Sequence, residues 1–274
     1  MPDLIVSAAN ARVKRLRALK DKKHRRAEGL FLAEGLRIGI EALDAGWAPQ
    51  AVAYAADRED HPLIRRLLRA CRGDLLPCTP AVLSTLSGKD NPQAVVAAFP
   101  IPSRSLADLR PGARLLAAER LRDPGNLGTL LRTCDGAGAS GMILMGDCTD
   151  PYSVEAVRAS MGAIFTVPVV HASLADVLAW KARHGATLTG AALHPAARDY
   201  RAVAYGRPAL LLLGNEAEGL PPALLEACDQ LVRIPMRGRA DSLNVAIAGA
   251  LLLYEALREE APAPPAPDTG GPPG

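Results

Sequence analysis

Residues 209–222 read Ala-Leu-Leu-Leu-Leu-Gly-Asn-Glu-Ala-Glu-Gly-Leu-Pro-Pro, an aliphatic run that enters a turn with two carboxylates between Gly214 and Gly219. A strand with no polar residue on either face is typical of a parallel sheet that helices cover on both sides. Pro221 and Pro222 are compatible with the first turn of a helix, where a backbone N–H has no partner in any case. The stretch therefore predicts an α/β fold with a polar loop at the carboxyl end of a central parallel strand.

The same alternation of strands and helices continues on both sides of this stretch. After residue 113 we expect further strands at 115–118, 142–145, 167–170, 187–191 and 231–235, with helices that start at Leu127, Ser153, Leu174 and Pro221 or span 243–259. Before residue 100 we expect helices at 10–26, 35–45, 62–70 and 80–86, with strands at 51–55 and 94–99. The chain is therefore expected to form two α/β units, 1–100 and 113–260, the second around a mainly parallel sheet. A proline-bearing linker, 101–112, would join them, and the Pro/Gly-rich stretch 261–274 predicts a disordered tail.

The composition excludes several classes of protein. Hydrophobic residues make up 49% of the 274 residues but aromatic residues only 4%, so the cores must be aliphatic. The longest apolar run, 245–253, is too short for a membrane helix. The positive charges near the start follow an apolar patch, the reverse order of a secretory signal. We therefore expect a cytoplasmic protein without a membrane partner. The five cysteines form no CxxC pair and the five histidines no HxxxH pair, so we expect free thiols and no metal site.

Positive charge is concentrated near the start of the chain. Residues 12–26 contain nine Lys or Arg and one acidic residue, and Val13, Leu16 and Leu19 recur among them at helical spacing. A solvated helix face is one interpretation, but such faces usually alternate their charges. The other interpretation is a surface that contacts phosphates. We favour RNA contacts from seven of these side chains: Arg12, Lys14, Arg15, Arg17, Lys20, Lys22 and Lys23.

Residues 136–141 match the glycine pattern of dinucleotide-binding proteins, GxGxxG. In those proteins the pattern follows a strand and opens a helix. Here it closes an expected helix and precedes the strand at 142–145, so we interpret Gly136 and Gly138 as the end of that helix.

Three polar segments carry stronger signals, because each follows an expected strand. They are 123–132 (DPGNLGTLLR), 213–220 (LGNEAEGL) and 234–245 (IPMRGRADSLNV). Each has a purely structural interpretation: Asn126 could cap a helix, Arg132 could be an ordinary surface residue, and Asp241 or Ser242 could cap the last helix. Since all three loops would lie at one edge of one sheet, a shared site is the better interpretation.

These segments, in this order, resemble the three signature motifs of the SpoU (TrmH-type) branch of the SPOUT RNA methyltransferases. Residues 157–165 (VRASMGAIF) are also similar to that family, so the resemblance spans about 115–254. The run 7–37 resembles the L30-like substrate-binding domain that many such enzymes carry. The resemblance implies a trefoil-knotted domain at 113–260, an RNA-binding domain at 1–100, and a homodimer whose active site combines both subunits.

The resemblance also implies roles for particular residues. S-adenosylmethionine would be held by loops that include Gly214, Ile234, Met236 and Leu243. The catalytic and RNA-facing positions would be Asn126, Arg132, Glu216, Ser242 and Asn244. The implied activity is methyl transfer to a ribose 2′-hydroxyl of structured RNA, most often ribosomal RNA.

These residue types fit that chemistry. A sulfonium methyl group is already activated, so no metal is required, and a fixed cation can stabilise the charge that develops on the attacking oxygen. Arginine keeps its proton at neutral pH, so Arg132 is expected to act as that cation and the base stays open. The alternatives are a tRNA ribose methyltransferase, a base methyltransferase of another SPOUT branch, and a non-catalytic RNA-binding protein.

Overall fold

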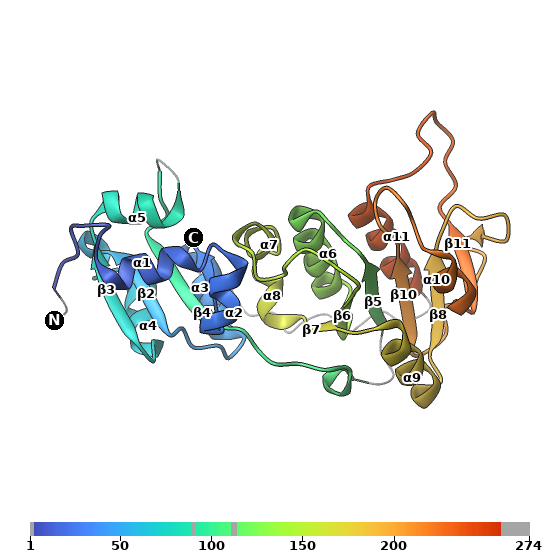
Figure 1. The fold of residues 1–274 in the computed structure, drawn as a ribbon, viewed down its shortest axis with the longest axis horizontal. Coiled ribbons are helices and arrows are strands. Elements are labelled where there is room, and N and C mark those ends of the chain that lie inside the picture. The colour runs from blue at the N-terminus through green and yellow to red at the C-terminus, as the bar shows by residue number, and fades with distance from the viewer. Residues whose placement is uncertain (1–2, 89–90, 111–113, 259–274) are drawn as a thin grey trace, which may run out of the picture.

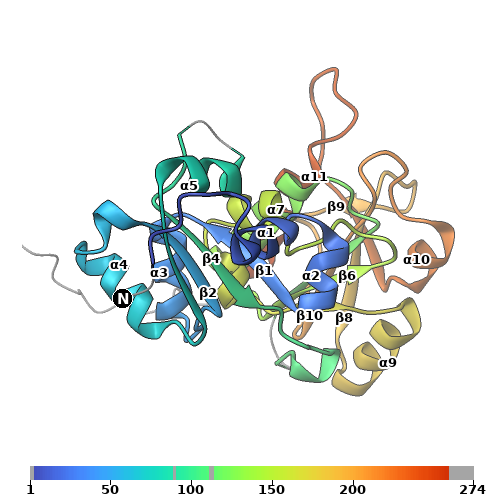
Figure 2. The same cartoon turned by 60° about the vertical axis from the view of Figure 1, so that its left-hand side comes forward.

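The computed structural model describes residues 3–88, 91–110 and 114–258, and in it the chain forms two α/β units that lie end to end (Figure 1). Each unit is built around its own sheet. A view turned by 60° shows the helices α1 and α2 of the first unit in front of the second unit (Figure 2). The extended segment from β4 (Val95–Pro100), through a short 3₁₀ turn at Leu106–Asp108, leads from one unit to the other.

The first unit contains a mixed sheet with the strand order β1-β4-β2-β3. Its other strands are β1 (Leu30–Glu34), β2 (Ala51–Ala55) and β3 (Asp74–Cys78). Its helices are α1 (Ala11–Ala18), α2 (Lys22–Glu28), α3 (Leu36–Asp44), α4 (Pro62–Ala70) and α5 (Pro80–Ser87), with a 3₁₀ turn at Ala56–Arg58. Since side chains alternate along a strand, α1 and α5 pack on one face of this sheet and α3 and α4 on the other.

The second unit contains a parallel sheet with the order β7-β6-β5-β10-β8-β11-β9, which confirms the predicted parallel sheet. Its strands are β5 (Arg114–Glu119), β6 (Gly141–Met145), β7 (Val169–His171), β8 (Thr187–Ala191), β9 (Arg198–Asp199), β10 (Ala209–Leu213) and β11 (Gln230–Arg233). Its helices are α6 (Pro124–Gly136), α7 (Val154–Ala159), α8 (Ala163–Thr166), α9 (Leu174–His184), α10 (Pro222–Ala227) and α11 (Val245–Arg258). Helices α6, α7, α8 and α11 cover one face, and α9 and α10 cover the other.

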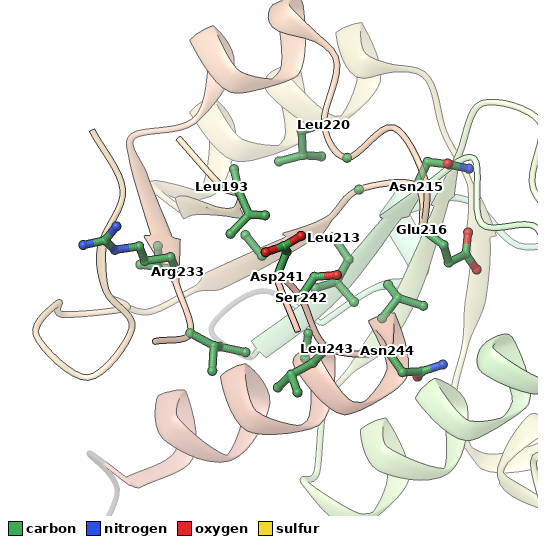
Figure 3. Close-up of a pocket in the computed structure, with 18 of the residues that line it drawn as sticks. Leu193, Leu213, Asn215, Glu216, Leu220, Arg233, Asp241, Ser242, Leu243 and Asn244 are labelled. Atoms are coloured by element: carbon green, nitrogen blue, oxygen red, sulfur yellow. The ribbon is translucent and has the colours of Figure 1, made fainter. Parts of the chain in front are cut away.

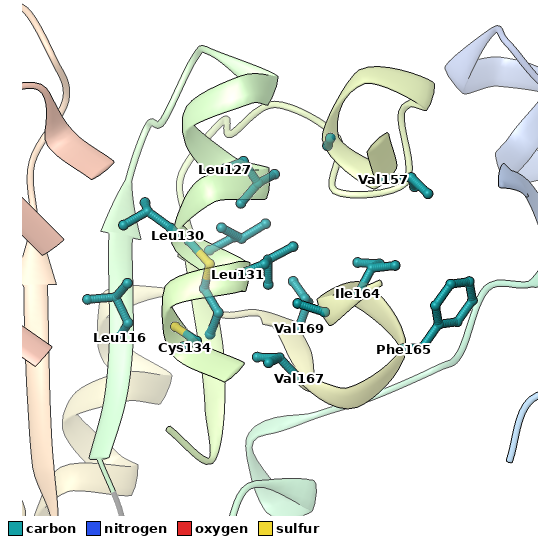
Figure 4. Packing of buried hydrophobic residues seen from close by; sticks show 14 of the residues in the cluster. Leu116, Leu127, Leu130, Leu131, Cys134, Val157, Ile164, Phe165, Val167 and Val169 are labelled. Atoms are coloured by element: carbon teal, nitrogen blue, oxygen red, sulfur yellow. The ribbon is translucent and has the colours of Figure 1, made fainter. Parts of the chain in front are cut away.

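Helix α6 is the centre of this packing. Its apolar stripe, Leu127, Leu130 and Leu131, is fully buried, and α6 packs against α7, α8 and α11, as the helical spacing predicts (Figure 4). Burying one such leucine contributes about 1.5–3 kcal/mol. Gly128 allows α7 to approach, because a Cβ there would lie 2.4 Å from the Cβ of Ala159.

Polar and aromatic contacts join the two units. The Arg25 guanidinium, whose side chain is 4% exposed, donates to Asp150 Oδ2 at 2.6 and 3.0 Å. Nearby, Arg158 donates to Glu34 at 2.7 Å. An aromatic cluster bridges the same boundary: Phe31, Trp47 and Phe99 from the first unit, with Tyr152 and Phe165 from the second.

The structure corrects several expectations about elements. The expected helix 10–26 is two helices, because Asp21 caps a new one and the chain turns between them. Strands β1 and β3 were missed; Pro77 inside β3 argues against a strand, and it is tolerated because β3 lies at the edge of its sheet. The expected strand at 167–170 begins only at Val169, after helix α8. Helix α6 begins at Pro124 rather than at Leu127, and it ends at Gly136 with Gly138 in a left-handed conformation, as predicted. The expected tail, 261–274, lies outside the described residues.

Candidate active site

A cavity of about 580 Å³ opens at the carboxyl ends of β8, β10 and β11, where ligands bind in parallel α/β sheets (Figure 3). Three loops form it: the residues after β8, the turn at 214–220, and the segment 234–244 that leads to α11. All four residues expected to hold the methyl donor line it: Gly214, Ile234, Met236 and Leu243. Ser242 and Asn244 lie on its rim in the same loop.

The turn after β10 is held by its own backbone and by one amide. A Cβ on Gly214 would lie 2.3 Å from the carbonyl carbon of Gly219, so only glycine permits this close approach. The Asn215 side chain accepts from the N–H groups of Ala217 and Glu218 at 2.9 and 3.1 Å, and donates to Arg120 O at 2.8 Å. The sequence reasoning missed Asn215, although an asparagine between two glycines is a known signal for such a turn.

Three side chains from the three polar segments meet in one hydrogen-bond network. Asn126 Nδ2 donates to Glu216 Oε1 at 3.2 Å, and Asn244 Nδ2 donates to Asn126 Oδ1 at 2.9 Å. Residues that are 90 and 118 positions apart in the chain are thereby joined at the edge of the cavity. This contact supports the interpretation of the three segments as one site.

The structure corrects the two proposed helix caps. Helix α6 is capped by Asp123, whose Oδ1 accepts from the Asn126 N–H at 2.6 Å, so the Asn126 amide is left to bind Glu216 and Asn244. Helix α11 is capped by Asn244 rather than by Asp241 or Ser242, because Asn244 Oδ1 accepts from the Ala246 N–H at 2.9 Å. Asn244 therefore holds both the start of α11 and the network.

The walls of the cavity fit S-adenosylmethionine. Leu193, Leu220 and Leu243 provide aliphatic surface for a flat base, as small-molecule sites usually do (Figure 3). Three carboxylates also line it, those of Glu216, Glu218 and Asp241. An aliphatic cleft that carries negative charge is complementary to an adenosyl group with a positive sulfonium centre.

Arg132 does not line this cavity. It lies on the exposed side of α6 and lines a second cavity of about 500 Å³, between α3, α6 and the turn that joins α7 to α8. No residue in the described ranges forms a hydrogen bond or an ion pair with its guanidinium. Within one chain the structure thus brings together four of the five expected catalytic residues and leaves the fifth at another surface.

The seven basic residues proposed to contact RNA are all exposed on α1, α2 and the turn between them. Two are tied to acidic neighbours: Arg15 donates to Glu28 at 2.5 Å, and Arg12 lies 3.9 Å from Asp74. Arg25, in the same basic run, is buried and donates to Leu19 O and Lys20 O as well as to Asp150. One of the nine basic residues is therefore structural.

The cysteines behave as the sequence predicts. All five are free, and burial raises the pKa of each thiol, to about 12 at Cys134 and about 11 at Cys78 and Cys228. Among the described residues no group of three His, Cys, Asp or Glu side chains could hold a metal ion. No helix in the described ranges is long and apolar enough to span a membrane.

Comparison with known proteins assigns both parts of the chain. Residues 113–254 match the SpoU rRNA methylase family, and residues 10–97 match the MRM3-like substrate-binding domain. The chain is 35% identical to a 23S rRNA (uridine(2479)-2′-O)-methyltransferase of Streptomyces viridochromogenes, over 93% of this chain and 92% of the relative. It is 32% identical to the 23S rRNA (guanosine(2553)-2′-O)-methyltransferase of Bacillus subtilis, over 91% and 97%.

Solved structures agree with these matches. An rRNA methyltransferase from Sinorhizobium meliloti, solved with bound AdoMet, superimposes with a TM-score of 0.86 and 42% identity, covering 93% of this chain and 97% of that one. The SpoU methyltransferase AviRb from Streptomyces viridochromogenes, in complex with AdoMet, gives 0.82 and 34%, covering 91% and 97%. The sequence motifs, the cavity and these relatives agree: the chain belongs to the SpoU rRNA methylase family.

Proposed function

We propose that this chain transfers a methyl group from S-adenosylmethionine to a ribose 2′-hydroxyl of folded RNA, and that the RNA is ribosomal. The observation that carries the proposal is the network of Asn126, Glu216 and Asn244, which joins three polar loops at the rim of a cavity that fits the methyl donor. Two of the relatives described above are named as 23S rRNA 2′-O-methyltransferases, and two solved relatives contain AdoMet.

The chain's own residues bind and orient the reactants. When bound, S-adenosylmethionine supplies a methyl group that is already activated by the sulfonium. Gly214, Ile234, Met236 and Leu243 hold it in the cavity. Asn126, Glu216, Ser242 and Asn244 offer hydrogen bonds at the rim that orient the ribose, and such positioning can lower a barrier by roughly 7–11 kcal/mol.

Arg132 supplies positive charge to the oxygen as it becomes anionic, from a second copy of the chain. Its guanidinium has no partner among the described residues and lies at a different surface from the network. The second copy is supported by α11, where Ile247, Leu251 and Tyr254 are exposed at helical spacing although the opposite face of the helix is buried in its own chain. A stripe of this kind is typical of a helix that packs against another protein.

Two further features belong to the proposal. After β11 the chain returns past β8 and β10, and α11 then packs on α6, β10 and β5. This return path supports a trefoil knot, in which the end of the chain passes through an earlier loop. We also place the enzyme in the cytoplasm, where its proposed ribosomal substrate is made.

The first unit, 1–100, holds the RNA in this proposal, through the seven exposed basic residues of α1 and α2. Such contacts provide affinity and orientation but no chemistry. The ion pair of Arg25 with Asp150 fixes these helices against the second unit, 113–260, so that a bound RNA has a defined position relative to the cavity.

The test is methyl transfer from labelled S-adenosylmethionine to ribosomal RNA of a strain that lacks this protein, followed by nuclease digestion and mass spectrometry. A single 2′-O-methyl nucleoside in ribosomal RNA, absent with Glu216→Gln, supports the proposal. Methyl on a base indicates the other SPOUT branch, methyl in tRNA indicates the other substrate, and RNA binding without transfer indicates a non-catalytic protein. Each of these three results overturns it.

A further inference from the structure

The second cavity lies where the two units meet. Apart from Arg132, none of its lining residues has a role in the proposed function. One wall comes from α3 of the first unit, and the other comes from α6 and the turn between α7 and α8. Its charged lining residues are Arg37, Glu41, Asp44, Arg132 and Asp135, and Met161 provides apolar surface.

The turn at Met161 and Gly162 has an unusual backbone. Met161 has a φ of +50° and Gly162 a φ of +96°, and side chains other than glycine rarely adopt this left-handed region. A Cβ on Gly162 would lie 2.0 Å from Glu41 Oε2, so this turn and α3 are in close contact. The Met161 side chain is nevertheless 43% exposed at the cavity. Backbone strain that holds an apolar side chain in water is typical of a functional position.

The walls around this turn are held in place by hydrogen bonds. Trp47 Nε1 of the first unit donates to Phe165 O of α8 at 2.9 Å. Within the second unit, Thr166 Oγ1 donates to Asp135 Oδ1 at 2.6 Å, and the buried Ser160 Oγ donates to Val157 O at 2.8 Å. The cavity is therefore formed before any ligand enters it.

The charge on the cavity distinguishes between two kinds of RNA contact. A groove that follows the phosphate backbone carries an excess of Lys and Arg over acidic residues. Here one oxygen of Glu41, Asp44 and Asp135 already accepts from Arg37, Arg66 and Thr166, respectively, which leaves the second oxygen of each carboxylate for a ligand. Arg132 and the apolar side chain of Met161 complete the lining. Carboxylates accept hydrogen bonds from the N–H groups of bases, and an apolar side chain can pack on a base face.

We infer that this cavity holds the target nucleotide of the RNA, unstacked from its neighbours, with its base beside Met161 and its ribose beside Arg132. The inference rests on the proposed function, because Arg132 is the residue expected at the reacting oxygen. Enzymes that do chemistry on a base take the nucleotide out of its stack into a pocket, and the same movement would expose a ribose 2′-hydroxyl here. The volume of about 500 Å³ lies within the usual range for small-ligand sites.

The methionines provide a direct test, since the described ones report on separate places. Met161 lies in this cavity and Met236 in the cofactor cavity, while Met142 and Met145 are buried in β6. Protein with ¹³C-labelled methionine methyl groups is titrated with the four nucleoside 5′-monophosphates to millimolar concentration, and separately with S-adenosylmethionine. Met161→Ala and Met236→Leu assign the two resonances.

We expect a nucleotide to shift the Met161 signal and to leave Met142, Met145 and Met236 in place. An unchanged Met161 signal with all four nucleotides, or a shift of Met236 instead, overturns the inference. S-adenosylmethionine should shift Met236; if it does not, the proposed function fails, whatever happens at Met161.

Kinetics on ribosomal RNA give the second readout. Met161→Ala removes the apolar surface that would be buried against the base, and kcat/KM should fall by about 10- to 100-fold if that burial is complete. The affinity for RNA should change by less than about 3-fold, because the phosphate contacts proposed for α1 and α2 dominate it. Leu63→Ala on α4 removes an equally exposed side chain, 42%, and serves as the matched control.

Ala45→Phe, which narrows the cavity from α3, should reduce transfer in the same way. Unchanged S-adenosylmethionine affinity shows that each variant is folded. If both cavity variants match Leu63→Ala in kcat/KM, the target nucleotide binds elsewhere.

Discussion

Two polar side chains of α6, Asn126 in its first turn and Arg132 further along, are in opposite circumstances. At its start, Asn126 is bonded on both sides, to Glu216 and to Asn244, within one chain. Further along the helix Arg132 is exposed, and none of the described residues pairs with its charge. The hydrogen bonds of Asn126 are formed within one chain, whereas the charge of Arg132 has no partner among the described residues.

This difference indicates how the site is assembled. A network that is already bonded can position a substrate without further ordering. An unpaired guanidinium stays available for a charge that exists only during the reaction. Since the two lie at different surfaces of one chain, the simplest complete site takes Arg132 from a second copy.

The largest effect should come from Arg132→Ala. We expect methyl transfer to fall by about 10²–10³-fold, because the variant lacks one preorganised group at the developing charge. S-adenosylmethionine affinity should not change, since Arg132 does not line the cofactor cavity. Single-turnover rates at saturating RNA are the measurement.

Arg183→Ala on α9 removes an equally exposed arginine and is the control. Equal single-turnover rates for the Arg132 and Arg183 variants would show that the exposed end of α6 takes no part in the reaction.

Charged residues on the exposed stripe of α11 test whether the active form is a dimer. Replacing Ile247 and Leu251 by Glu removes two large apolar contacts, worth about 3 kcal/mol or more, so the dimer should weaken by at least about 100-fold. Sedimentation at micromolar concentration should show monomers that bind S-adenosylmethionine but transfer no methyl group. An active monomer would remove the need for a second Arg132.

A smaller effect is expected from the basic helices. Replacing Lys14, Arg15, Lys22 and Lys23 by Gln should reduce the slope of log K against log salt by roughly 0.7–0.9 for each phosphate that the variant no longer neutralises. Turnover at saturating RNA should change much less than affinity.

The matched control neutralises four exposed arginines on or beside α4, which packs on the other face of the same sheet: Arg58, Arg65, Arg69 and Arg72. The same reduction of slope in both variants would mean that α1 and α2 are not the RNA surface.

The smallest effect concerns Asn244, which caps α11 and donates to Asn126 at the start of α6. Asn244→Ala removes the cap of α11, which should cost about 1 kcal/mol of unfolding free energy and lower Tm by about 2–4 °C. Ser173→Ala removes the cap of α9 and should destabilise the chain to a similar extent. Only Asn244→Ala should also slow transfer. If both variants keep full activity, Asn244 is a cap and nothing more.

Much of the fold could be predicted, because local patterns determine it. The apolar run of β10 predicted a parallel sheet, and the stripe of Leu127, Leu130 and Leu131 predicted the buried face of α6. Contacts with distant residues decided what was missed. Strand β3 contains a proline and forms because β2 pairs with it. The basic run folds as two helices because Asp21 caps the second one, and this arrangement buries Arg25 against Asp150.

The sequence predicted which loops form the site but not which hydrogen bonds their side chains make. Motif spacing placed Asn126, Glu216 and Asn244 at one edge of the sheet, yet the caps that free or occupy their side chains depend on loop geometry. The helical period puts Arg132 on another face of α6 from Asn126. Sequence alone could not show that no described residue of the same chain pairs with Arg132, because that depends on distant contacts.

The most direct test of a shared site is a mixed dimer. Arg132→Ala and Glu216→Gln chains are each purified as an inactive dimer and are also co-expressed in equal amounts. If Arg132 acts on the network of the other chain, about half of the dimers are mixed and each has one intact site, so the mixture should recover about one quarter of wild-type transfer. If both residues act within one chain, every site in the mixture carries a defect, and transfer should stay as low as in the separate variants.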